Sequence, residues 1–200
     1  MASELRGKRV AFIATEGVEE VELTEPWKAV EEAGGEPELI SLSDDEFHAW
    51  NHFDKSRTFK PDRSIDEARV DDYDALVLPG GVANPDQLRT NDNVVSFIFE
   101  FAASGKPIGV ICHGPWTLIE AGVVAGRTIT SWPSLQTDLR NAGATWVDEE
   151  VVIDRGLVSS RRPDDLAAFT AKIVEEFAEG RHAASAEAAQ RVVHADATPS

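Results

Sequence analysis

The feature of this sequence that most constrains its fold is the alternation of short apolar segments with longer amphipathic ones. The clearest apolar segments are typical of buried strands and lie at residues 8–14, 74–79 and 106–111. Segments with helical spacing of apolar residues follow, most clearly at residues 20–33 and 93–104. Strands that alternate with helices predict an α/β domain with a mostly parallel sheet, and right-handed crossovers place helices on both of its faces.

The rest of the chain fits the same architecture with weaker signals. We expect further strands at residues 38–42, 127–130, 151–153 and 157–159, and further helices at residues 114–121, 135–141 and 163–179. Residues 43–69 are irregular and rich in charged and aromatic side chains, which predicts a loop or a small hairpin. One domain is expected over residues 1–180, followed by a flexible C-terminal tail at residues 181–200, where apolar periodicity fades.

Composition and charge exclude several classes of function. Hydrophobic residues make up 42% of the chain and charged residues 28%, which is ordinary for a folded protein. Acidic residues outnumber basic ones by 36 to 19 and give a formal charge of -17, so we expect neither nucleic acid nor a membrane as a partner. No apolar run suits a membrane span and the N-terminus does not resemble a signal peptide, so a cytoplasmic protein is expected. Adaptation to a salt-rich cytoplasm is an alternative reason for the acidic surface.

Three segments place reactive side chains, or glycines that let a ligand approach the backbone, at the carboxyl ends of strands. Ligands bind at these ends in open parallel sheets. Cys112, the only cysteine, follows the strand at residues 106–111 and precedes a helix. Such an elbow exposes the side chain at the sheet edge, and the helix N-terminus beside it favours a thiolate. Gly80 and Gly81 end a neighbouring strand and allow backbone N–H groups to approach an oxyanion. Residues 19–22 supply carboxylates after the first strand.

Each of these segments also has a simpler interpretation. A lone cysteine is most often an inert buried side chain. A pair of glycines is common in plain turns, and acidic residues are favoured in the first turn of any helix. The joint placement of the three segments at one sheet edge favours the functional interpretation.

The same residues resemble the PfpI-type intracellular cysteine protease and deglycase family, within the superfamily of the Parkinson-disease-associated protein. The matching motifs are Glu19-Glu20-Val21-Glu22-Leu23, Leu78-Pro79-Gly80-Gly81, Cys112-His113-Gly114-Pro115-Trp116 and Ser159-Ser160-Arg161. The resemblance covers roughly residues 8–179 and extends in fold to class I glutamine amidotransferases. It implies a flavodoxin-like three-layer sandwich that uses no cofactor and forms a homodimer or a larger homo-oligomer.

The resemblance also implies roles for individual residues. Cys112 corresponds to the nucleophile, Glu22 to the carboxylic acid that hydrogen-bonds it, and His113 to a general base. A residue adjacent to the nucleophile at an elbow usually points elsewhere, so we expect the backbone N–H of His113, with those of Gly80 and Gly81, to form the oxyanion hole.

A third acidic group, which the family takes from a neighbouring subunit, corresponds here to Asp86. The family pattern has Glu at that position, and Asn84 beside it is a further departure from the pattern. A complete Cys-His-acid triad would therefore need Asp86 as its acid, and a second copy of the chain to supply that residue.

The segment at residues 47–52 differs from the shorter loop of the simplest family members and is expected to line or cover the site. The candidates for lining the site are Glu19, Trp50, His52 and Trp116. His48 and His52 are spaced i,i+4, but their segment does not have a helical pattern, so we expect no metal ligands there.

The leading hypothesis is a cytoplasmic, stress-related cysteine hydrolase. Its substrate is either a peptide or a reactive carbonyl such as a glyoxal or a glycation adduct, and an elbow cysteine in a small pocket favours the carbonyl. The second hypothesis is a redox-sensing or chaperone-like stress protein in which Cys112 is oxidised rather than catalytic. A nucleotide-binding module is a third, disfavoured because no Gly-rich phosphate loop follows the first strand.

Overall fold

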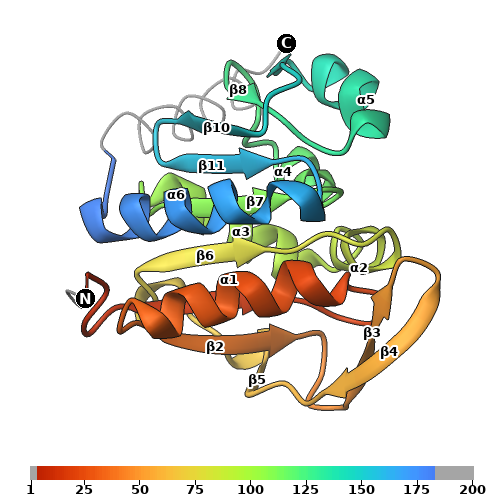
Figure 1. Ribbon diagram of the computed structural model, residues 1–200, viewed down its shortest axis with the longest axis vertical. Coiled ribbons are helices and arrows are strands. Elements are labelled where there is room, and N and C mark those ends of the chain that lie inside the picture. The colour runs from red at the N-terminus through yellow and green to blue at the C-terminus, as the bar shows by residue number, and fades with distance from the viewer. Residues whose placement is uncertain (1–3, 183–200) are drawn as a thin grey trace, which may run out of the picture.

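A seven-stranded sheet forms the centre of the molecule (Figure 1), as described for residues 4–182 by a computed structural model. The strand order is β10-β11-β7-β6-β1-β2-β5, and all neighbouring pairs are parallel except the β10–β11 hairpin. The strands are β1 (Arg9–Ile13), β2 (Glu36–Ser41), β5 (Arg63–Ser64), β6 (Ala75–Leu78), β7 (Ile108–Ile111), β10 (Val151–Asp154) and β11 (Leu157–Ser160). The central strands β6 and β7 are buried along their whole length, which explains why their sequences are continuously apolar.

Helices cover both faces of this sheet, so the predicted flavodoxin-like three-layer sandwich is confirmed. The helices are α1 (Glu20–Glu32), α2 (Ala83–Leu88), α3 (Asp92–Ala103), α4 (Pro115–Glu120), α5 (Gln136–Asn141) and α6 (Leu166–Glu179). On one face α6 buries Phe169, Ile173 and Phe177, each of which contributes about 2 kcal/mol through burial. On the other face α3 and α4 pack against a second apolar cluster.

Two short two-stranded sheets stand beside the central one. β3 (Phe47–Asn51) and β4 (Asp54–Phe59) form an antiparallel hairpin in the region where a loop or hairpin is expected. β8 (Thr128–Ile129) pairs with β9 (Thr145–Trp146). The sequence did not predict α2 or β9, because α2 contains Pro85 directly after a Gly-rich turn and β9 has only two residues.

Side chains of the loop between β1 and α1 hold the β3–β4 hairpin at the carboxyl end of the sheet. Glu16 accepts the backbone N–H of His48 at 2.8 Å, and Glu19 accepts that of His52 at 3.0 Å. The hairpin thereby covers the ends of the parallel strands without joining their sheet.

Two further expectations concern the periphery of the molecule. Residues 183–200 of the expected tail lie outside the described residues. Among residues 4–182, no helix is both long and apolar enough to cross a lipid bilayer.

Candidate active site

Cys112 occupies the sharp turn between β7 and α4. Its φ is +62°, in the left-handed region that residues other than glycine rarely adopt, and such a conformation costs about 1–3 kcal/mol. Two backbone hydrogen bonds hold the turn, from Cys112 N–H to Ser160 O at 3.1 Å and from Trp132 N–H to Cys112 O at 2.9 Å. The residue is only 6% exposed, so the expectation of an exposed thiol is wrong: the elbow directs the thiol inward.

Glu22 in the first turn of α1 is the most deeply buried acid of the site, at 0% exposure. Its Oε2 accepts the N–H of Gly80 at 2.9 Å, whereas Oε1 has no hydrogen-bond partner among the described residues. Burial raises the pKa of Glu22 to about 8, so its carboxyl is protonated at neutral pH and can act as a donor.

The thiol of Cys112 experiences the same desolvation. Burial raises its pKa well above the ordinary value, and the neighbouring Glu22 raises it further. The backbone N–H groups of Gly81 and His113 act on the sulfur in the opposite direction, with a smaller effect than burial. Desolvation therefore opposes the expected low-pKa thiolate, and a thiol that keeps its proton needs a base to remove it.

A ring nitrogen of His113 lies within hydrogen-bond distance of that thiol, although the lowered pKa of the imidazole makes it a weak base. Its Nδ1 lies 3.2 Å from the Cys112 sulfur, and its Nε2 lies 3.4 Å from Ser134 Oγ. Its ring stacks on Trp132 at 5.7 Å between centroids, and burial lowers its pKa to about 4, so the imidazole is neutral at neutral pH. The expectation that this side chain points away from the nucleophile is wrong, because the Trp132 contact turns the ring back toward the sulfur.

Gly80 and Gly81 differ in what their N–H groups do. The Gly80 N–H is occupied by Glu22, so the expectation that Gly80 is an oxyanion donor is corrected. A Cβ atom at Gly80 would lie 2.5 Å from Glu22 Oε2 and 2.6 Å from Cys112 Cβ, and the close approach of these groups therefore requires glycine. Gly81 and His113 remain as the backbone donors nearest the sulfur.

A pocket of about 600 Å³ opens above the thiol. The expected residues Glu19, Trp50 and His52 line it, together with Phe53, Val82, Trp132 and Pro163, which the sequence did not indicate. Phe53 is 92% exposed at the tip of the hairpin and forms an apolar part of the pocket rim.

Trp116, also expected in the lining, is not part of it. Its Nε1 donates to Asp138 at 3.0 Å, and its ring lies under the guanidinium of Arg89 at 4.8 Å. It contacts the edge of the His113 ring at 5.2 Å, so it supports that ring from outside the pocket.

Asp86 lies at the pocket rim, and its side chain is 57% exposed. It is paired with Arg89 at 2.7 Å, and within the described part of the chain no hydrogen bond joins it to His113. Residues 4–182 of one chain therefore do not assemble a complete triad with Asp86.

Asn84 is a structural member of the site that the sequence did not reveal. It is fully buried, accepts the N–H of Thr15 at 2.8 Å, and donates to the carbonyls of Pro79 and Gly80 at 3.1 and 3.0 Å. These bonds fix the Gly80 peptide that holds Glu22. Its position shortly after the Pro-Gly-Gly turn was the only available signal.

Fold and site together define a class: a flavodoxin-like α/β protein with a buried cysteine at a strand–helix elbow, beside a protonated glutamic acid and a neutral histidine. The sequence profile described as the DJ-1/PfpI family matches residues 8–176. The chain belongs to this family, which confirms the resemblance seen in the sequence.

Relatives and solved structures agree with this assignment. The chain is 41% identical to "Putative cysteine protease YraA" of Bacillus subtilis, over 81% of this chain and 94% of the relative. It is 40% identical to the deglycase PH1704 of Pyrococcus horikoshii, over 84% of this chain and 98% of the relative. Among solved structures it is similar to DJ-1beta of Drosophila melanogaster, with a TM-score of 0.78 and 27% identity over 100% of both chains.

Proposed function

We propose that this protein is a stress-related cysteine hydrolase in which Cys112 attacks a reactive carbonyl compound. The observation that carries the proposal is the thiol at the base of a pocket, with a neutral imidazole nitrogen 3.2 Å from its sulfur. Relatives named as deglycases, a cysteine protease and a general stress protein support the hydrolase class and the link to stress.

The first step follows from the protonation states. The sulfur of Cys112 forms a bond to the carbonyl carbon while its proton passes to Nδ1 of His113. The electron pair of the C=O double bond moves to oxygen, where the N–H groups of Gly81 and His113 and the O–H of Glu22 can stabilise it. With an aldehyde the immediate product is the oxyanion of a hemithioacetal, and return of the proton from His113 to that oxygen gives the neutral hemithioacetal.

A peptide would continue differently. The tetrahedral adduct would expel the amine, which takes the proton from His113, and water would then hydrolyse the thioester and restore the thiol. Pocket size and the buried thiol favour the small carbonyl, because an extended chain must pass the rim formed by Phe53 and Val82 to reach a sulfur that is almost fully covered.

A redox-sensing role is the second candidate. The protonated Glu22 beside the sulfur favours it, since its O–H could donate to an oxygen of an oxidised cysteine. The raised pKa of Cys112 counts against it, because the thiolate is the form that peroxide oxidises.

Turnover assays on methylglyoxal, a glycated amino acid and an unstructured peptide test the proposal. We expect turnover of a carbonyl substrate, slower or no cleavage of the peptide, and no activity in Cys112→Ala with any of them. Peptide cleavage faster than carbonyl turnover would select the protease. Absence of all three activities, with rapid sulfinate formation at Cys112 in mild peroxide, would select the redox sensor.

Self-association is part of the proposal, with a cytoplasmic location. The position of Asp86 at the rim, without a bond to His113, suits a group that completes the site of a second copy. Mixing inactive Cys112→Ala with an inactive Asp86→Ala variant should then restore partial activity. Full activity of a dilute monomer in light scattering would contradict the shared site.

A further inference from the structure

Three potential metal ligands meet at the C-terminal end of α6, far from Cys112. Glu176 and Glu179 lie in the last turns of the helix, and the chain reverses at Gly180, whose φ is +86°. The reversal brings His182 back beside Glu176, and one ligand atom from each of the three residues lies within 4.8 Å of the others. In Figure 1 this end of α6 lies on the opposite side of the molecule from α2 and the β3–β4 hairpin.

Glu176 is the member of this cluster that points to a bound ligand. It is 7% exposed, and its Oε2 is buried without a hydrogen-bond partner among the described residues. Nε2 of His182 is also buried without a hydrogen-bond partner among the described residues; it lies 3.1 Å from that oxygen, at ion-pair distance but in a geometry that makes no hydrogen bond. Buried polar atoms are normally satisfied, so two such atoms side by side require an explanation.

The imidazole is held in place by its own surroundings. The N–H of His182 donates to Gly105 O at 2.7 Å, at the loop between α3 and β7. The ring packs on Gly156, at the start of β11, where a Cβ atom would lie 2.7 Å from ring Cδ2. The ring is therefore fixed between two loops and α6, and Nε2 is directed at Glu176.

We propose that Glu176, Glu179 and His182 bind a divalent cation of the Zn²⁺ type. Imidazole nitrogen and carboxylate oxygen are zinc ligands, and in tetrahedral coordination at bond lengths of 2.0–2.1 Å two ligand atoms lie about 3.4 Å apart. The 3.1 Å between His182 Nε2 and Glu176 Oε2 is close to that separation. Glu179 is exposed and can turn toward the ion, which leaves a fourth position for water.

Electrostatics around the cluster also favours a cation. The cluster brings the carboxylates of Glu176 and Glu179 together beside a single imidazole, so acidic groups outnumber basic ones at this place. The carbonyls at the C-terminus of α6 add partial negative charge. A bound ion would tie the end of α6 to β11 and to the loop before β7, and would leave the chemistry at Cys112 unchanged.

Zinc titration of the full chain tests the site. The background is Cys112→Ala, because a thiol beside an imidazole can itself bind zinc, and the protein is first dialysed against a chelator. We expect calorimetry with zinc chloride to show about one ion per chain and thermal unfolding to shift upward with zinc.

The variants His182→Ala and Glu179→Gln should each weaken zinc binding at least tenfold and abolish the zinc-dependent shift. Glu175→Gln is the matched control, because Glu175 lies on the same helix but pairs with Lys172, and it should bind zinc as the parent does. Circular dichroism verifies that each variant is folded. The proposal is overturned by a folded parent that binds no zinc, or by His182→Ala binding zinc as tightly as the parent; either result would leave a simple His182–Glu176 ion pair.

Discussion

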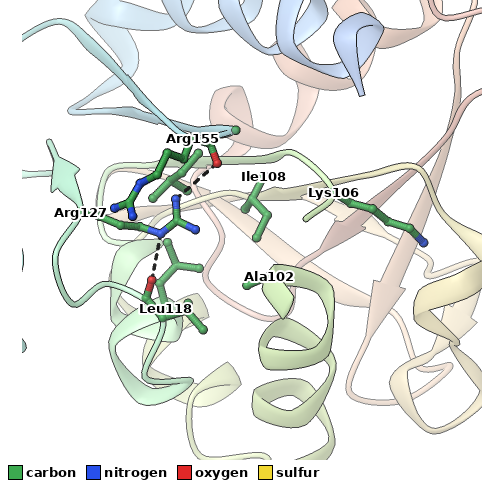
Figure 2. Close-up of a pocket in the computed structure, with 9 residues that line it drawn as sticks. Ala102, Lys106, Ile108, Leu118, Arg127 and Arg155 are labelled. Carbon is green, nitrogen blue, oxygen red and sulfur yellow. Dashed lines mark hydrogen bonds between the residues drawn. The ribbon is translucent and has the colours of Figure 1, made fainter. Parts of the chain in front are cut away.

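Two buried ionisable side chains lie at opposite ends of the central sheet, and their surroundings are opposite in kind. At the amino end, Arg127 donates from Nε to Val123 O at 3.1 Å and from Nη1 to Asp154 O at 2.9 Å. Figure 2 shows its guanidinium between neighbouring carbonyls, where it lines a cavity of about 10 Å³, enough for about one water molecule. At the carboxyl end, Glu22 has one oxygen without a partner among the described residues and faces a pocket of about 600 Å³.

The difference shows which of the two buried ionisable side chains serves function. Arg127 is held by carbonyls and by the nearby charge of Asp154, so it joins the loops at the amino end of the sheet. Glu22 is incompletely satisfied beside a nucleophile, and that is where a perturbed pKa can serve chemistry. Substitutions at the carboxyl end should therefore lower activity more than stability, and substitutions at the amino end should lower stability more than activity.

The largest expected effect is on activity at the carboxyl end. Cys112→Ala should lower kcat/KM for the carbonyl substrate by about 10³-fold or more, because no other nucleophile reaches the substrate. Its unfolding free energy should change by about 1 kcal/mol or less, since only one sulfur atom is removed. Steady-state kinetics and urea unfolding measure both, and turnover equal to that of the parent would remove Cys112 from the mechanism.

At the amino end we expect a loss of stability with little change in activity. Arg127→Met should lower the unfolding free energy by about 3 kcal/mol, because it removes a buried hydrogen bond to the Val123 carbonyl and a partly buried one to the Asp154 carbonyl. Activity per folded molecule should stay within about twofold of the parent, a barrier change below about 0.5 kcal/mol. A large loss of activity in fully folded Arg127→Met would contradict the assignment of Arg127 to stability alone.

Substitution of Glu22 should raise the activation free energy of the reaction less than substitution of Cys112 does. Glu22→Ala should raise it by about 2–3 kcal/mol, the range for a lost buried hydrogen bond to a developing charge. Glu22→Gln should cost less, because an amide can still donate. Single-turnover kinetics rank the three proteins, and equal rates in all of them would exclude Glu22 from the site.

The raised pKa of Glu22 also predicts a pH dependence of stability. Folded Glu22 keeps its proton up to about pH 8, whereas the unfolded chain releases it near the ordinary glutamate pKa of 4.5. The folded state therefore binds more protons between these values, and stability from this residue is lost as pH rises through the window, by at most about 1.4 kcal/mol per pH unit.

Glu22→Gln removes this dependence and provides the measurement. Its unfolding free energy relative to the parent should increase steadily from pH 5 to pH 8. His113, whose folded-state pKa is lowered to about 4, works in the opposite sense below pH 6.5 but is common to both proteins, so it cancels in the difference. A difference that stays constant with pH would show that the carboxyl is already ionised in the folded protein.

The smallest effect is expected at the rim. Phe53→Ala should raise KM about two- to threefold and leave kcat unchanged, because the exposed ring contacts substrate at the mouth of the pocket and not at the sulfur. The matched control is Phe59→Ala in the same hairpin, where the ring does not line the pocket. A fall in kcat for Phe53→Ala alone would place its ring in the chemical step.

Much of the fold could be predicted from the sequence because the strongest signals are local. β6 and β7 are continuous apolar segments, and α3 carries a regular stripe of apolar residues, so all three were expected where they occur. The carboxyl ends of parallel strands meet at one edge, and this alone predicted that Cys112, Glu22 and Gly81 would lie together.

What could not be predicted depends on three-dimensional packing. The direction of the His113 ring follows from stacking on Trp132, which is distant in sequence. The protonation of Cys112 depends on how completely the hairpin and loops exclude water, and no local pattern records that. Asn84 was read only as a departure from a motif, although two of its hydrogen bonds hold the peptides on either side of Gly80 and a third joins it to Thr15.

The attachment of the β3–β4 hairpin has a consequence for how this scaffold can diversify. The hairpin forms its own sheet and is fastened to the β1–α1 loop through Glu16 and Glu19, so none of its strands belongs to the central sheet. Insertions or deletions at its tip leave the layers of the core intact. The strands of the hairpin still bury Phe47 and Ala49 in the core, so the exchangeable part is the tip around Phe53, and grafting tips of other lengths onto this chain is a direct way to alter its substrate range while keeping the reactive cysteine in place.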